Sequence, residues 1–214
     1  MEVLFANAGH LIGSAAITLK IKEEDLSTVI LYSADIGGYR SVLLQPPAEA
    51  PQADYIILES TYGDKHHDIT FNTIDTLHRL INKTCIEKKG KLIIPAFSVA
   101  YTQEVLYALN QLSLEKKLLE LLYFIDNPLS LKATTTIKKY KEQYNDRLQK
   151  VLQIDDDPFH FPVLKHLENV EDSKKLVEYP EPCVIISARG TADAGRVRHH
   201  IISCIGNVTM RFYW

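Results

Sequence analysis

Apolar and polar residues alternate in the first part of the chain, as they do in half-buried strands. Apolar residues take every second position from Ile17 to Ile21, and threonine or lysine fills the positions between them. A polar turn at residues 23–27 separates this run from a second one, Thr28 to Tyr32. This arrangement is typical of a β-hairpin, and residues 1–16 and 53–59 contain two further apolar runs that predict strands.

After Asp68 the spacing of the apolar residues changes from two to about 3.6 residues, which predicts a helix. We expect it to end near Lys88-Lys89-Gly90, where the lysines suit the negative end of the helix dipole and Gly90 suits a C-cap. Further elements are predicted by the same patterns: a strand over 91–96, a helix over about 101–112, a strand over 118–125, and a helical stretch that begins at Asp126-Asn127-Pro128-Leu129-Ser130. A strand-helix alternation of this kind predicts a parallel sheet covered by helices.

The pattern is less regular in the later part of the chain. Residues 132–150 are rich in lysine and are predicted to be helical, with a solvated face. Residues 155–162 interrupt the alternation; their three aspartates could bind a metal, but beside proline they are more typical of a turn. Residues 182–187 predict another strand, followed by a glycine loop that opens a helix.

Three residues with useful chemistry lie near the predicted strand ends: His10, Asp35 and Glu59. Strand ends are where α/β proteins place their sites. A histidine alone is more often structural, and an aspartate alone is more often a turn residue. Together, imidazole and carboxylate are ligands that catalytic zinc takes, although such a zinc needs about three protein ligands. His66 and His67 are weak candidates for the others, because adjacent side chains diverge in an extended chain.

Composition indicates the class of protein but not its activity. The chain has 214 residues, is 46% hydrophobic and 24% charged, and carries a net charge of -3, so it is typical of a globular protein without a general attraction to nucleic acid. Its three cysteines form no paired motif, and no apolar run approaches the roughly 20 residues that cross a bilayer. We therefore expect a cytoplasmic protein with no membrane partner.

Several short blocks resemble, in their order and spacing, the β-CASP branch of the metallo-β-lactamase superfamily, which includes ribonuclease J and the endonuclease of messenger-RNA 3′-end cleavage. The blocks are residues 8–15 (AGHLIGSA), 33–37 (SADIG), 58–64 (LESTYGD), 94–104 (IPAFSVAYTQE), 126–130 (DNPLS), 157–159 (DPF) and 183–200. Nearly the whole chain is covered by them.

The resemblance implies a di-zinc phosphodiesterase that acts on RNA. It implies that His10 is a ligand of one zinc, that Asp35 bridges both, and that Glu59 is an acid that orients groups around the site. Such a bridging carboxylate holds two cations that activate a water and stabilise charge on a phosphate. The family's His-x-His-x-Asp-His block and its two later histidines are not in this sequence, so we expect an interior fragment with an incomplete zinc-ligand set.

The sequence also departs from the family pattern within the blocks. Ala34 stands where the family usually has glycine, Ala100-Tyr101 replaces Gly-Arg, and Arg189-Gly190-Thr191 replaces Ser-Gly-Met. The loop at Gly190 could hold a phosphate on backbone N–H groups, or Asp193 could cap the helix there; both alternatives stay open. The candidate substrate-binding residues are Ser98, Arg189, Gly190, Thr191 and Arg196. The arginines could equally be solvated residues on a helix face.

We therefore predict an α/β fold, with residues 1–64 as part of a metallo-β-lactamase αββα sandwich and residues 65–214 as most of a β-CASP domain. The predicted function is that of a fragment of a zinc-dependent ribonuclease for RNA processing or degradation, inactive alone. The alternative is a non-catalytic β-CASP paralogue that binds RNA or a partner subunit. RNA is the expected partner, and a homodimer is left open.

Overall fold

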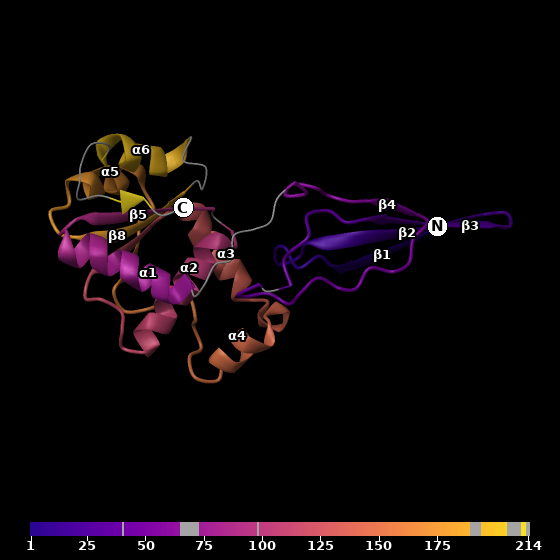
Figure 1. Cartoon of the computed structure of the whole chain (residues 1–214), viewed down its shortest axis with the longest axis horizontal. Coiled ribbons are helices and arrows are strands. Elements are labelled where there is room, and N and C mark those ends of the chain that lie inside the picture. The colour runs from indigo at the N-terminus through magenta and orange to yellow at the C-terminus, as the bar shows by residue number, and fades with distance from the viewer. Residues whose placement is uncertain (40, 65–72, 98, 189–193, 205–210, 213–214) are drawn as a thin grey trace. The chain divides into compact units, whose positions relative to one another are not determined.

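The chain forms two compact units, each built around its own sheet. The structure is a computed structural model that describes residues 1–39, 41–64, 73–97, 99–188, 194–204 and 211–212 (Figure 1). The first unit holds residues 1–69 and 140–156, and the second holds residues 70–139 and 157–214. Among the described residues, no helix is both long and apolar enough to cross a membrane.

The first unit contains a four-stranded sheet in the order β1-β2-β3-β4. Its strands are β1 (Glu2–Asn7), β2 (Ala15–Glu23), β3 (Leu26–Tyr32) and β4 (Tyr55–Ile57). The first three strands pair antiparallel, which confirms the predicted hairpin, and β4 pairs parallel to β3. The candidate residues His10, Asp35 and Glu59 lie in the loops after β1, β3 and β4.

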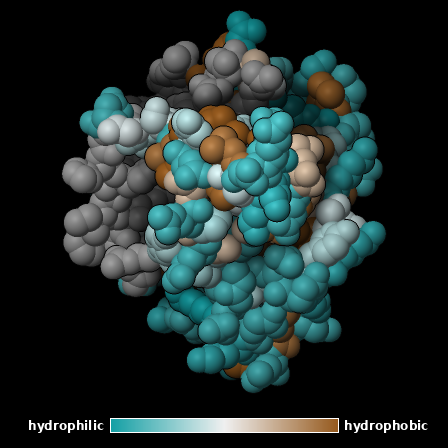
Figure 2. Space-filling model, turned by 90° about the vertical axis from the view of Figure 1, so that its right-hand side faces the viewer, coloured by the Kyte–Doolittle hydropathy of each residue, from teal (hydrophilic) through white to brown (hydrophobic). Residues whose placement is uncertain are grey.

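One face of this sheet is apolar and exposed. The register places Phe5 opposite Ile17, Ile17 opposite Tyr32, and Tyr32 opposite Ile57, so these side chains form one row across the four strands. Phe5 is 71% exposed and Ile57 is 58% exposed, whereas Leu31, on the other face, is buried. Figure 2 shows one side of the molecule, on which single hydrophobic residues, in brown, lie among hydrophilic ones. A contiguous apolar face of this kind is typical of an interaction surface.

The predicted helical stretch over residues 132–150 is interrupted. Helix α3 (Pro128–Ile137) ends early, a 3₁₀ turn η2 (Lys141–Gln143) follows, and α4 (Asp146–Val151) is a separate short helix. Asn145 caps α4, because its side-chain oxygen accepts a hydrogen bond from Leu148 N at 2.9 Å.

The segment 140–156 joins the first unit through backbone contacts. Asn145 N donates to Leu43 O at 2.9 Å, and Asn145 Nδ2 donates to Ser41 O at 2.9 Å. Gln45 N also donates to Gln143 O at 3.2 Å. The observed division is thus discontinuous in sequence, unlike the single boundary predicted near residue 64.

The second unit contains a five-stranded parallel sheet in the order β7-β6-β8-β5-β9. Its strands are β5 (Lys91–Ala96), β6 (Leu122–Asp126), β7 (Leu164–His166), β8 (Cys183–Ala188) and β9 (Arg211–Phe212). Strand β5 matches its prediction, and β6 begins four residues later than predicted. The parallel sheet with helices confirms the predicted fold class.

Helices pack on both faces of this sheet. They are α1 (Thr73–Ile81), which continues into a π-helical turn η1 (Asn82–Glu87), then α2 (Tyr101–Leu114), α3, α5 (Val170–Glu178) and α6 (Gly195–Cys204). Phe124 and Ile185 of the sheet form a core cluster with Leu176 of α5 and Val197 of α6. The buried Lys91 Nζ donates to the carbonyls of residues 176 and 177, at the C-terminal end of α5.

Candidate functional site

The loops that carry His10 and Asp35 are locked against each other. Gly37 N donates to Ala8 O at 2.8 Å. A Cβ atom at Gly37 would lie 1.8 Å from Gly9 O, so this approach is open only to glycine. This contact holds together the two loops that carry His10 and Asp35, at the ends of β1 and β3.

The backbone around His10 is held by side chains of its own loop. Gly9, at a φ of 68°, donates its N–H to Asn7 Oδ1 at 3.0 Å. Ser14 Oγ accepts hydrogen bonds from His10 N at 3.2 Å and Leu11 N at 3.1 Å. The His10 side chain itself is exposed, as is that of Asp35.

Glu59 connects the end of β4 to the Asp35 loop. Its carboxylate accepts hydrogen bonds from Ile36 N at 3.1 Å and Thr61 N at 3.2 Å, and its own N–H donates to Ser33 Oγ at 3.0 Å. The bond from Ile36 N lowers the pKa of Glu59 most, Thr61 lowers it further, and the charge of His10 adds to the effect. Glu59 is therefore ionised in neutral solution, and it positions the backbone next to Asp35.

These residues do not complete a zinc site by themselves. Within the part of the chain that the structure describes, no group of three or more histidine, cysteine, aspartate or glutamate side chains is placed to hold a metal. A catalytic zinc takes about three protein ligands plus water. His10 and Asp35 have suitable donor atoms, but they are an incomplete set.

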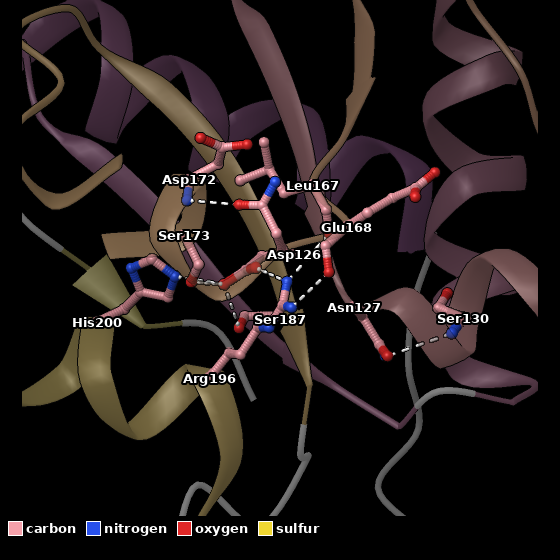
Figure 3. Close-up of polar contacts among 11 residues, drawn as sticks. Asp126, Asn127, Ser130, Leu167, Glu168, Asp172, Ser173, Ser187, Arg196 and His200 are labelled. Atoms are coloured by element: carbon pink, nitrogen blue, oxygen red, sulfur yellow. Dashed lines mark hydrogen bonds and ion pairs between the residues drawn. The ribbon is translucent and has the colours of Figure 1, made fainter. Parts of the chain in front are cut away.

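A buried aspartate in the second unit was not among the predicted site residues. Asp126 ends β6, has no exposed surface, and accepts hydrogen bonds at its two carboxylate oxygens (Figure 3). Its partners are Ser173 Oγ at 2.6 Å, Ser187 Oγ at 3.4 Å, Arg196 Nη1 at 2.8 Å and His200 Nε2 at 2.8 Å. Burial raises the pKa of Asp126, but the bonds from His200, Ser173 and Arg196 lower it by more, so its pKa lies below the usual value.

Arg196 is bound inside the second unit. Besides Asp126, its guanidinium donates to Leu167 O at 3.0 Å and Glu168 O at 2.7 Å, and its side chain is 16% exposed (Figure 3). This geometry favours a structural role over the RNA contact expected of it. The sequence did contain a signal, because Arg196 and His200 are four residues apart and so share one helix face.

The other candidate substrate-binding residues, Ser98, Arg189, Gly190 and Thr191, lie outside the described residues. The chain on either side of residue 98 is tightly turned. Tyr101 N donates to Val99 O at 3.0 Å across Ala100, and Thr102 Oγ1 donates to Phe97 O at 2.7 Å. The N-terminal end of α2 is thereby attached to the end of β5.

The sequence is similar to known RNA-processing proteins. A Beta-Casp domain model matches residues 102–209. Ribonuclease TTHA0252 of Thermus thermophilus is 29% identical over 201 residues, which are 94% of this chain and 45% of that protein. An RNase J-like protein of Methanocaldococcus jannaschii is 31% identical over 200 residues, which are 92% of this chain and 44% of that protein. Cleavage and polyadenylation specificity factor subunit 3 of Dictyostelium discoideum is 26% identical over 211 residues, which are 92% of this chain and 24% of that protein. The chain thus spans less than half the length of these relatives.

Proposed function

The chain belongs to the β-CASP branch of the metallo-β-lactamase superfamily, and on that basis we propose that it is part of a zinc-dependent RNA phosphodiesterase. The observation that carries the proposal is the contact of Glu59 with the loop that carries Asp35. The relatives named as a ribonuclease and an RNase J-like protein support RNA as the substrate class.

Each residue of the site has a distinct role in this proposal. Glu59 binds Ile36 N, which fixes the loop that presents Asp35. Asp35 and His10, both exposed, would supply two of the zinc ligands. Bound zinc ions would supply an activated water and stabilise charge on the phosphate.

The chain alone should be inactive, because its described residues lack a complete ligand set and it spans less than half of the relatives. The remaining ligands would come from elsewhere in the intact protein. The cytoplasmic location and the homodimer stay predictions.

Cleavage of a labelled single-stranded RNA, measured with the intact protein and zinc, tests the proposal. Glu59→Gln weakens the hold on the Asp35 loop and should lower the rate by about 10–100-fold, as loss of a residue that orients a metal ligand does. Asp35→Ala should lower it further. Asp25→Ala, which changes an exposed acid in the β2–β3 turn, is the matched control and should leave the rate within about twofold.

Two outcomes would contradict the proposal. Cleavage that survives Asp35→Ala would exclude the assigned site. Tight RNA binding by the intact protein without any zinc-dependent cleavage would favour the alternative, a non-catalytic paralogue that binds RNA.

A further inference from the structure

A pocket of about 470 Å³ lies in the second unit, between the strands β6 and β7 and the helix α5. This volume is within the range of roughly 300–1,000 Å³ that small-molecule sites have. Its lining is largely apolar and comes from Leu122, Phe124, Leu167, Leu176 and Tyr179. The pocket is therefore large and apolar enough to hold a flat ring.

Two aromatic rings line one part of this pocket. Phe124 is buried, and Tyr179 is half-buried and packs edge-to-face on it, with ring centroids 5.7 Å apart and an interplanar angle of 73°. Tyr179 follows the last turn of α5 directly, so its backbone is tied to the helix. The pocket thus has an aromatic surface that is already positioned before any ligand binds.

Another part of the pocket lining, at Leu167, is held by backbone hydrogen bonds. Leu167 N donates to Ile125 O at 2.9 Å, and Leu167 O accepts from Arg196 (Figure 3). Glu168 O also accepts from Arg196. The buried network around Asp126 therefore fixes the segment after β7, which forms this part of the pocket lining.

The rim of the pocket carries two lysines, one histidine and one carboxylate. Lys165, His166 and Lys175 line it and are exposed, and Asp172 lines it half-buried. Lys175 contacts Asp172 at 3.2 Å, but both side chains are largely solvated, so this ion pair is weak and leaves the ammonium available. His166 reaches the surface, but partial desolvation of its ring lowers its pKa. His160 and Lys138 lower this pKa further against a smaller opposing effect of Glu168, so the ring is neutral in neutral solution and can exchange hydrogen bonds with a base.

We propose that this pocket binds one base of single-stranded RNA on the aromatic surface of Tyr179, with Lys165 and Lys175 contacting the adjoining phosphates. The inference rests on the proposed function for its choice of RNA. Stacking on an aromatic ring beside a basic groove is how proteins hold single strands without reading sequence. An apolar peptide side chain would also fit the apolar lining of the pocket, but it would form no ionic contact with Lys165 or Lys175.

Fluorescence anisotropy with a labelled 15-nucleotide oligouridine tests the pocket, using the intact protein in EDTA so that metal-dependent cleavage is stopped. Tyr179→Leu keeps an apolar side chain and removes the stacking surface, and it should weaken binding by at least about fivefold. The double variant Lys165→Gln, Lys175→Gln should lower the slope of log affinity against log salt by about 1.4, since each phosphate contact contributes about 0.7. The control Lys174→Gln removes an exposed lysine of α5 that is not part of the pocket lining, and it should change neither quantity appreciably.

The outcomes separate this inference from the proposed function. If the wild-type protein cleaves RNA but Tyr179→Leu and the double lysine variant bind as the wild type does, the pocket assignment is overturned and the enzymatic proposal stands. A protein partner would then be the better occupant. If the pocket variants lose affinity and the wild-type protein does not cleave, the RNA site is supported and the enzymatic proposal fails. The double lysine variant changes only exposed side chains, so it remains informative even if Tyr179→Leu lowers stability.

Discussion

Replacing Ala100 with glycine should stabilise the second unit, because the backbone there has a conformation suited to glycine. Ala100 has a φ of 66° and a ψ of -69°. The hydrogen bond from Tyr101 N to Val99 O spans it, so Ala100 is the central residue of a classic γ-turn, which is rare and strained. The family usually has glycine at this position, so the chain retains a glycine-type turn while carrying a Cβ atom there.

The size of the effect follows from two opposing terms. A non-glycine residue in such a conformation costs about 1–3 kcal/mol. Glycine loses more backbone entropy on folding, which costs about 0.5–1 kcal/mol relative to alanine. The expected net gain is about 1 kcal/mol, which corresponds to a rise in Tm of roughly 2–4 °C for a chain of this size.

Scanning calorimetry of the purified protein measures this shift and can resolve separate transitions if the two units unfold independently. The matched control is Ala133→Gly, in the interior of α3, which should lower stability by about 1 kcal/mol because glycine is a poor helix residue. If Ala100→Gly lowers Tm as much as Ala133→Gly does, the strain argument is refuted. A rise in Tm for Ala100→Gly together with a fall for Ala133→Gly would support it.

Two further changes test the charged groups of the second unit. Asp126→Asn leaves the largely buried Arg196 and the buried His200 without their carboxylate, and it should lower the free energy of unfolding by about 3–5 kcal/mol in urea denaturation. The control Asp172→Asn changes a half-buried acid in a solvated ion pair and should cost less than about 1 kcal/mol. Similar small losses for both would contradict the network's role. Burial raises the pKa of the Glu104 carboxyl group. The folded chain therefore holds the carboxyl proton more tightly than the unfolded chain does, and it loses stability as pH rises through the folded-state pKa. Glu104→Gln should therefore raise Tm at neutral pH and leave it nearly unchanged in acid, below the pKa values of the folded and the unfolded chain. An equal gain in Tm at both pH values would speak against desolvation as the cause.

The helices and strands were predictable where a single element has a clear pattern of apolar and polar residues. The β2–β3 hairpin alternates apolar and polar residues and β5 is a continuous apolar run, and both were placed correctly. Strand β7 and helix α5 were not predicted, because a three-residue strand is too short for a period and α5 is mostly polar. The break after α3 depends on Asn145, which bonds to Ser41 more than 100 residues away, and local periodicity contains no such information.

The candidate site was predictable to a different degree in each unit. The approach of Gly9 and Gly37 brings the His10 and Asp35 loops together, and the role of these two residues as zinc ligands stays a prediction. The network at Asp126 joins side chains that are 47 to 74 residues apart, and its partners come from three different elements. A single sequence shows the helical spacing of Arg196 and His200, but not which strand they face.

Glu59 and Asp126 show why the position of an acid at a strand end does not determine its role. Each carboxylate accepts several hydrogen bonds, and each has a lowered pKa. Backbone N–H groups lower the pKa of Glu59, which lies beside the exposed loop that carries Asp35. Asp126 is instead enclosed by Arg196, His200 and two serines. Its carboxylate, through these hydrogen bonds, holds α6 and the segment after β7 in place. Access to solvent, which only the folded chain defines, is therefore what separates a candidate catalytic acid from a structural one.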